Sequence, residues 1–165
     1  LSRFYKLSLS KGRDTVTIEN ELEHVKAYVQ IQNVRYNDGI SLTIDVPEEI
    51  LPMEVPKIIL QPIVENAIIH GILETYREKG TIVISGRIQD DTVILEVKDD
   101  GAGIEADKLT RLLTHDSSNE YHGYGIINIH NRIKLFFGQE YGLTYRSKPK
   151  QGTIVSIRIP LKETD

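Results

Sequence analysis

The sequence contains no cysteine, which excludes disulfides and thiolate metal sites and fits a reducing compartment such as the cytoplasm. It has no apolar run approaching the length of a membrane span and no recognisable signal peptide. Basic residues do not predominate, because 20 lysines and arginines face 24 aspartates and glutamates, for a net charge of -4. A nucleic-acid-binding domain should be basic, so nucleic acid is not an expected partner.

The remaining composition is that of an ordinary globular domain. Hydrophobic residues make up 39% of the chain and charged residues 27%, and 165 residues suffice for one domain that buries a core without disulfides or metals. The sequence begins at Leu1 rather than at a methionine. We therefore expect it to be a piece of a longer protein.

Hydrophobic periodicity predicts both helices and strands. Long helices are predicted over residues 17–36, 62–72 and 124–137, the first capped by Thr17 and the second irregular at its start because of Pro62. Strands are predicted over residues 40–46, 81–88, 92–98, 142–148 and 153–159. Between them we expect a surface connector at 47–56, and a short helix followed by a mobile loop at 105–122. Elements in this mixed order predict an α/β or α+β layer architecture.

The predicted helix 62–72 carries two polar residues suited to a nucleotide. Asn66 and His70 are four residues apart and so share one face of the helix. An asparagine oxygen can complete the octahedral shell of a Mg²⁺ ion otherwise held by phosphates, and a histidine can donate to a phosphate oxygen. An equally open alternative makes Asn66 a surface residue and His70 a cation facing the negative end of the helix dipole.

A second segment, residues 99–103, follows a predicted strand and reads Asp-Asp-Gly-Ala-Gly. Its continuation matches the dinucleotide fingerprint G-x-G-x-x-A, but Asp99 and Asp100 would repel a pyrophosphate, and no second strand ends in an acidic residue about 20 positions later. A better role for Asp99 is to accept hydrogen bonds from an amino group such as the N6 amine of adenine. Gly101 and Gly103 would then let the ring approach the backbone, although an ordinary Asp-Gly turn remains the alternative.

A third segment places Gly123 and Gly125 at the start of the predicted helix 124–137. Backbone N–H groups at a helix N-terminus bind phosphate, and glycine permits the dihedral angles that such a loop needs. The alternative is a pair of glycines that only hinge a loop. The nearby acidic residues and histidines, His115, Asp116, Glu120 and His122, have no ligand spacing typical of a metal site.

Together these three segments resemble the N, G1 and G2 boxes of the GHKL (Bergerat-type) ATP-binding fold, and most closely those of YesM/LytS-type bacterial sensor histidine kinases. Residues 62–71 resemble the P-x-x-E-N-A-x-x-H-G box, residues 99–103 resemble D-x-G-x-G, and residues 123–128 resemble G-x-G-L-x-N. Further likeness lies in Arg132-Ile133, in Gly152-Thr153-Ile154-Val155, and in residues 21–35, which resemble E-L-E-x-V-x-x-Y-x-x-I-Q-x-x-R. The resemblance covers nearly the whole chain.

The resemblance implies a fold, two cofactors and a set of binding residues. The fold would be a two-layer sandwich with helices on one face of a mixed β-sheet. The cofactors would be ATP and Mg²⁺, with Asn66 as the metal ligand and Asp99 as the adenine reader. The implied cofactor-binding residues are Asn66, His70, Asp99, Gly101, Gly103, Ile104, Gly123, Gly125, Ile126 and Thr153.

Departures from the wider family bear on the reaction. ATP-hydrolysing members such as gyrase, the Hsp90 chaperones and mismatch-repair proteins place a glutamate base four residues before the metal-binding asparagine. That position is Pro62 here, which has no proton acceptor, so transfer to a protein acceptor is favoured over hydrolysis. Asp100 replaces the more usual asparagine and Ile126 the usual leucine, and both replacements look tolerable.

The phosphoacceptor histidine is expected outside this chain. In the family it lies in a P-H-F-x-x-N type box, and no histidine of this sequence has that setting. We therefore expect no catalytic phosphoacceptor here. Residues 1–16 would be the remnant of a dimerisation helix and linker, and residues 17–165 the ATP-binding catalytic domain.

The implied function is a protein-histidine kinase activity that transfers the ATP γ-phosphoryl group to a histidine on the missing upstream dimerisation domain, for relay to a response regulator. That domain and the cognate regulator would be the partners. This fragment would be cytoplasmic without direct membrane contact, within a membrane-anchored homodimer. Two alternatives share the fold: an anti-sigma-factor-type serine kinase, and a non-catalytic nucleotide-binding interaction module.

Overall fold

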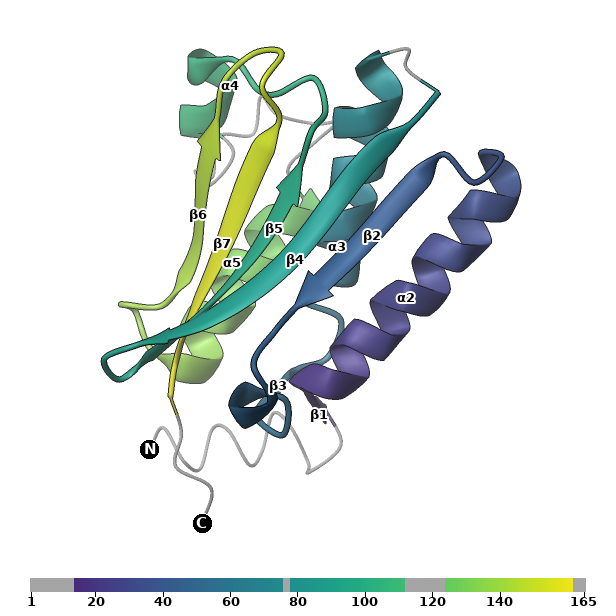
Figure 1. The fold of residues 1–165 in the computed structure, drawn as a ribbon. Helices are drawn as coiled ribbons and strands as arrows, with labels where there is room; N and C mark the ends of the chain where they lie inside the picture. Colours follow the sequence, from purple (N-terminus) through teal and green to yellow (C-terminus); the bar gives the residue numbers. More distant parts are fainter. Residues whose placement is uncertain (1–13, 76–77, 112–123, 162–165) are drawn as a thin grey trace.

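A five-stranded mixed sheet forms one layer of the molecule and helices form the other (Figure 1). The computed structural model describes residues 14–75, 78–111 and 124–161. The strand order is β2-β4-β5-β7-β6, with β2 parallel to β4 and the other pairs antiparallel. The bounds are β2 (Ile40–Asp45), β4 (Gly80–Gln89), β5 (Thr92–Asp99), β6 (Gly142–Ser147) and β7 (Thr153–Pro160). The predicted sandwich with a mixed sheet is confirmed.

The helices α2 (Ile18–Arg35), α3 (Gln61–Asn66) and α5 (Tyr124–Phe137) lie behind the same face of the sheet in Figure 1. Thr17 caps α2 as predicted, because its side chain accepts a hydrogen bond from the Asn20 N–H at 3.1 Å. A short helix, α4 (Ala106–Arg111), follows β5, and the loop predicted after it lies outside the described residues. None of the described helices is long and apolar enough to cross a membrane.

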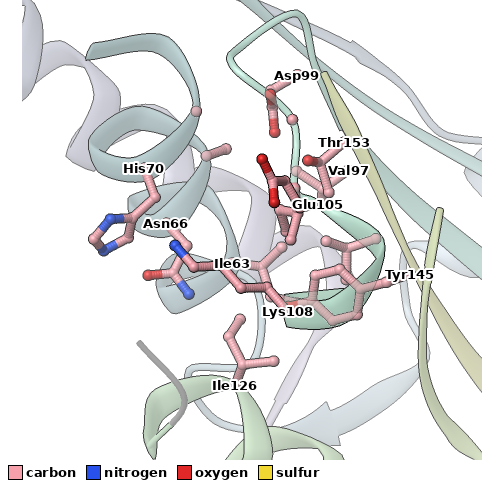
Figure 2. Close-up of a pocket in the computed structure, with 15 residues that line it drawn as sticks. Ile63, Asn66, His70, Val97, Asp99, Glu105, Lys108, Ile126, Tyr145 and Thr153 are labelled. Atoms are coloured by element: carbon pink, nitrogen blue, oxygen red, sulfur yellow. The ribbon is translucent and has the colours of Figure 1, made fainter. Parts of the chain in front are cut away.

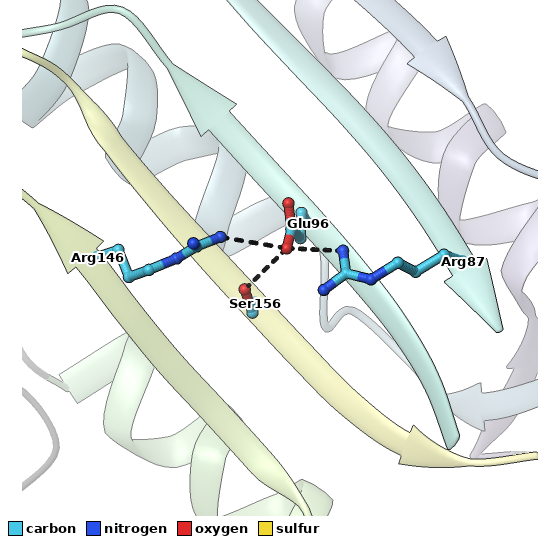
Figure 3. Close-up of polar contacts among 4 residues, drawn as sticks. All are labelled: Arg87, Glu96, Arg146 and Ser156. Atoms are coloured by element: carbon cyan, nitrogen blue, oxygen red, sulfur yellow. Dashed lines mark hydrogen bonds and ion pairs between the residues drawn. The ribbon is translucent and has the colours of Figure 1, made fainter. Parts of the chain in front are cut away.

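Strand alternation divides the sheet into a buried face and an open face. In β5, Val93, Leu95 and Val97 are buried against the helices, whereas Glu96 points the other way. On the open face, Glu96 accepts from Arg87 at 2.9 Å, and more weakly from Arg146 at 3.4 Å and Ser156 at 3.5 Å (Figure 3). Both arginines are about half exposed or more, so these contacts add little stability and mainly keep this face polar.

The connector after β2 is buried in part, so its predicted surface location is wrong. Ile50, Met53 and Val55 are buried, and β3 (Glu54–Pro56) pairs antiparallel with β1 (Thr15–Thr17). The prolines of this segment break regular structure, but its apolar side chains still complete the core beside α2. The predicted boundary at residue 17 falls inside β1, at the point where this paired strand meets α2.

The helix predicted as regular over residues 62–72 changes its winding instead. It begins at Gln61, so Pro62 lies in the first turn, where a missing N–H costs nothing. After Asn66 it widens into a π-helix, η2 (Ala67–Ile72), in which the Leu73 N–H reaches back to the Ile68 carbonyl, and a 3₁₀ turn, η3 (Leu73–Thr75), follows. The Gly71 carbonyl accepts instead from the Ala102 N–H at 2.9 Å, outside the helix. This tertiary bond explains why local periodicity did not predict the wider turn.

Two glycines let this helix and the loop after β5 come into backbone contact. A Cβ placed on Gly101 would lie 2.2 Å from the Gly71 carbonyl carbon. A Cβ placed on Gly71 would lie 2.8 Å from an Asp99 carboxylate oxygen. Neither distance leaves room for a methyl group, so both positions require glycine.

Gly101→Ala is therefore expected to lower the free energy of unfolding by about 2–3 kcal/mol, because the new methyl group meets backbone that cannot move aside cheaply. Gly125→Ala is the matched control, since a Cβ there would meet only the Pro62 Cβ at 3.9 Å. Alanine in α5 should leave stability unchanged or raise it by up to about 1 kcal/mol. Urea unfolding of both variants measures the difference, and a Gly101→Ala protein as stable as wild type would contradict the steric argument.

Candidate functional site

A pocket of about 340 Å³ opens between the helix layer and the sheet, at the end of β5. Figure 2 shows Asn66 and His70 on the helix side, and Asp99, Thr153 and Tyr145 on the sheet side. The lining residues come from α3, η2, the loop between β5 and α4, α4, α5 and three strands: Ile63, Asn66, Ala67, His70, Gly71, Val97, Asp99, Gly103, Ile104, Glu105, Lys108, Ile126, Tyr145, Thr153 and Val155. The pocket is thus apolar in its walls and polar at particular points.

Asp99 is the buried acid of the pocket and is only 5% exposed. Its Oδ1 accepts a hydrogen bond from the Gly101 N–H at 2.8 Å, which fixes the carboxylate at the turn after β5. Burial raises the pKa of Asp99 to about 6, while the backbone N–H groups of Gly101 and Thr153 act in the opposite direction. A buried carboxylate with acceptor capacity left over can recognise an amino group that enters the pocket.

The loop after Asp99 is held on the β6–β7 hairpin by close backbone contacts. Gly103 has φ +73°, and a Cβ there would lie 1.9 Å from the Lys148 carbonyl oxygen. The Ile104 N–H donates to the Ser147 hydroxyl at 2.8 Å, and that hydroxyl also bonds to Thr153 Oγ1 at 2.8 Å. These bonds bring Gly103, Ile104 and Thr153 to the same wall of the pocket.

Asn66 and His70 both line the opposite wall, so the shared face predicted from their spacing is confirmed despite the change in helical winding. Asn66 is the last residue of α3, and His70 lies in the π turn. A half-exposed amide and imidazole at the mouth of a pocket can meet a charged part of a ligand without a large desolvation cost.

Most of the residues predicted for cofactor binding meet in this pocket. Those that line it are Asn66, His70, Asp99, Gly103, Ile104, Ile126 and Thr153. Gly101 serves the contact with Gly71 instead, and Gly125 stands in open space at the start of α5. Gly123 lies outside the described residues, as do His115, Asp116, Glu120 and His122.

Sequence reasoning missed several lining residues. Tyr145 reaches the pocket because it pairs with Val155 across β6 and β7, and burial raises its pKa above the ordinary value. Glu105 immediately precedes α4 and Lys108 lies in its first turn, and Lys108 extends into the pocket in Figure 2. Strand register could have suggested Tyr145, because it alternates with exposed Thr144 and Arg146. Nothing in the local pattern indicated Lys108.

The donor set fits a nucleotide with a metal. The apolar side chains that line the pocket together with Asp99 suit a flat base with an amino group, whereas an amide, an imidazole and the Lys108 ammonium suit phosphates. Among the described residues there is no group of three or more His, Cys, Asp or Glu side chains that could hold a metal by themselves. A Mg²⁺ ion would therefore need ligand oxygens in addition to Asn66, as it usually does beside phosphates.

Comparison with known families agrees with this geometry. Residues 54–163 match the family described as histidine kinase-, DNA gyrase B-, and HSP90-like ATPase, and residues 1–40 match the histidine kinase family. The chain belongs to the histidine kinase-, DNA gyrase B- and HSP90-like ATPase family. Membership confirms the resemblance found in the sequence and implies that the chain binds ATP.

Individual relatives of the chain are sensor kinases. The chain is 31% identical over 163 residues to the sensor histidine kinase BtsS of Escherichia coli (strain K12), covering 99% of the chain and 27% of that protein. It is 34% identical over 155 residues to the sensor histidine kinase YesM of Bacillus subtilis (strain 168), covering 94% and 26%. The chain thus spans about a quarter of the length of these curated relatives.

The fold also has solved counterparts. The catalytic domain of the histidine kinase ThkA superposes with a TM-score of 0.69 at 18% identity, covering 90% of this chain and 99% of that one. At this identity the likeness shows the fold, which is that of a histidine kinase catalytic domain.

The buried charge of Asp99 should make stability depend on pH. Below about pH 4 the carboxyl group is protonated in both the folded and the unfolded chain, so folding has no charge to bury. As pH rises through about 6 the folded chain must carry a buried charge, and the shift of its pKa from 3.8 to about 6 corresponds to a loss of about 3 kcal/mol. Asp99→Asn should therefore be more stable than wild type at pH 7.5, by about 1–3 kcal/mol, and lose that advantage near pH 4.

Urea unfolding at both pH values tests this expectation, with exposed Asp91→Asn as the control. A stability difference between Asp99→Asn and wild type that does not change with pH would contradict it.

Proposed function

We propose that the chain is the ATP-binding catalytic domain of a sensor histidine kinase, and that it serves to transfer the ATP γ-phosphoryl group to a histidine on an upstream dimerisation domain. The observation that carries the proposal is one pocket with a buried carboxylate on the sheet side and Asn66 with His70 on the helix side, in a member of this ATPase family. Such an arrangement separates the recognition of a base from the handling of phosphates.

In this proposal Asp99 accepts the hydrogen bond of the adenine amine, while Ile104, Ile126 and Val97 enclose the ring. Asn66 would hold Mg²⁺, which supplies charge neutralisation at the phosphates when bound. His70 and Lys108 would donate to phosphate oxygens. The chain's contribution to the reaction is then positioning of the nucleotide and exclusion of water from the base.

Transfer to a protein side chain is favoured over hydrolysis by the groups around the pocket. Pro62 offers no proton acceptor, and Glu65 does not line the pocket. Glu65 acts on the other side of its helix, where burial and then the charge of Glu65 raise the pKa of Tyr28. The carboxylates that line the pocket are those of Asp99 and Glu105. Neither stands four residues before Asn66, where ATP-hydrolysing members place the base that activates a water.

The acceptor is proposed to be a histidine beyond those described here. His24 bonds to the Gln61 side chain, and His130 Nδ1 accepts from the Leu143 N–H at 2.9 Å, so both are engaged in the fold. The match of residues 1–40 to the histidine kinase family supports an upstream kinase segment at the start of the chain. The division into a dimerisation remnant and linker at 1–16 and a catalytic domain at 17–165 remains a proposal. Relatives that are sensor kinases support a response regulator as partner, and a membrane-anchored homodimer with this domain in the cytoplasm.

Asn66→Ala should remove the gain in ATP affinity that Mg²⁺ provides, by about tenfold, because one oxygen that contacts the metal is lost. Binding of ADP without Mg²⁺ should stay unchanged, since the adenine end of the pocket is intact. Isothermal titration calorimetry with and without Mg²⁺ measures both quantities, and exposed Asn131→Ala is the control. Equal losses for the two nucleotide forms would argue against a specific metal role for Asn66.

Phosphoryl transfer itself is tested with radiolabelled ATP and Mg²⁺. We expect the chain to bind ATP without labelling itself, and to label a separate fragment that carries the parent protein's dimerisation helices. That label should be acid-labile and base-stable, and it should form slowly because a free acceptor lacks the high effective concentration of a tethered one.

Three outcomes would change the assignment. Strong self-labelling on one of the chain's own histidines, or vigorous ATP hydrolysis, would overturn it. Acid-stable label on a serine of a partner would favour the anti-sigma-factor type of kinase. ATP binding with no transfer to the dimerisation fragment would favour the non-catalytic module.

A further inference from the structure

A buried glutamate on α2 holds the chain that leads into α3. Glu21 is only 4% exposed, and its carboxylate accepts hydrogen bonds from the N–H groups of Ile58 at 2.6 Å, Ile59 at 3.3 Å and Leu60 at 3.3 Å. The N-cap residue of α3 is Leu60, which has no side-chain oxygen to offer, and Pro62 has no N–H. Glu21 thus satisfies backbone donors at the start of α3 from another helix.

An arginine on α5 holds the same turn from its other side. The Arg132 guanidinium donates to the Lys57 carbonyl at 2.6 Å and to the Ile58 carbonyl at 3.4 Å. We name residues 57–60 the α3 turn. An anion on α2 therefore takes its N–H groups while a cation on α5 takes its carbonyl oxygens, and the turn joins three helices of the layer.

The α3 turn contains a residue in an unfavourable backbone conformation. Ile58 has φ +59°, in the left-handed region that a β-branched residue rarely adopts. Its side chain is 49% exposed, so packing of that side chain does not explain the conformation. Such a conformation persists only where the surroundings fix it, and Glu21 and Arg132 contact the Ile58 backbone on both sides.

The position of α3 depends on this turn. Ile63 and Asn66 line the pocket from α3, and Ile126 lines it from α5, the helix that carries Arg132. Asp99 is fixed separately, by β5 and by the Gly101 N–H. The contacts that hold the α3 turn are therefore different from the hydrogen bond that holds the Asp99 carboxylate.

We propose that Glu21 and Arg132 are positioning residues, which hold the α3 turn so that Asn66 faces the phosphate end of the nucleotide. This inference rests on the proposed function, because it takes Asn66 as the Mg²⁺ ligand. The proposal thus gives a role to Glu21, the first glutamate of the E-L-E segment, and to Arg132, which follows the segment that contains Gly123 and Gly125. Loss of either contact should disturb the metal end of the pocket and leave the adenine end as it was.

The test compares Glu21→Gln with Glu23→Gln in the whole chain. Glu23 lies on the same helix, but its side chain is 63% exposed and forms an ion pair with the neighbouring Lys26. Calorimetry gives the affinity for ATP with and without Mg²⁺ and for ADP without it, after circular dichroism has shown that each variant is folded at the working temperature. Glu21→Gln should lose about tenfold or more of the Mg²⁺-dependent affinity, as residues that orient a metal ligand do, with ADP binding within about twofold of wild type. Glu23→Gln should match wild type in both.

Arg132→Gln provides a second variant whose folding is at little risk, because Arg132 is exposed, and exposed Arg158→Gln is its control. The same selective loss is expected for Arg132→Gln, and the double variant with Glu21→Gln should lose less than the two single losses combined, since both act through one turn.

The outcomes separate this inference from the proposed function. If wild type gains no ATP affinity from Mg²⁺, the proposed function fails and the inference fails with it. If wild type shows the gain and Glu21→Gln keeps it, only the positioning role is overturned. A parallel fall in both affinities would also overturn it, because a merely structural role would weaken the whole pocket.

Discussion

The backbone contact between Gly71 and Gly101 is the constraint on which the site depends. It joins the end of the η2 helix to the loop after β5, and the Ala102 N–H bond to the Gly71 carbonyl closes it. Asp99 stands immediately beside this contact, so the same two glycines also fix where the carboxylate meets the pocket. A larger side chain at either position would separate the helix wall from the sheet wall, and the pocket lies between these walls.

The site also carries local costs that the rest of the fold must offset. Asp99 buries a charge beside apolar side chains, and Ile58 holds a positive φ. Each feature opposes stability, on the order of 1–3 kcal/mol. Along α2, α5 and the sheet, the buried isoleucines, leucines and valines follow the helical and strand periods. Asp99 lines the pocket, and Ile58 lies in the turn that leads into α3, so both departures from local rules occur where the proposed function competes with stability.

Most elements of this fold were predictable because their signals are local. The alternation of Val93, Leu95 and Val97 with polar neighbours predicts a strand with one open face, and Thr17 predicts the start of α2. The winding change after Asn66 and the burial of Ile50 were not predictable in this way, since each follows from contacts with distant segments. Among the site residues, Asp99 and Asn66 belong to recognisable motifs. Tyr145 and Lys108 enter the pocket only through strand pairing and the placement of α4.

Glu21 belongs to a segment that resembles the family pattern, and the structure gives a physical reason for the glutamate at this position. In the sequence, Glu21 is one residue of a segment that resembles the family pattern, and nothing in that segment suggests a chemical role for it. In the structure it is a buried acceptor for three N–H groups, 37 to 39 residues away along the chain. A glutamine at this position would direct its NH2 group toward backbone N–H groups, and two donors cannot form a hydrogen bond. An alanine would leave the buried N–H groups without acceptors. Glu21 thus satisfies the N–H groups of the α3 turn. The α3 turn sets the direction of α3, from whose last residue, Asn66, the side chain must face the pocket.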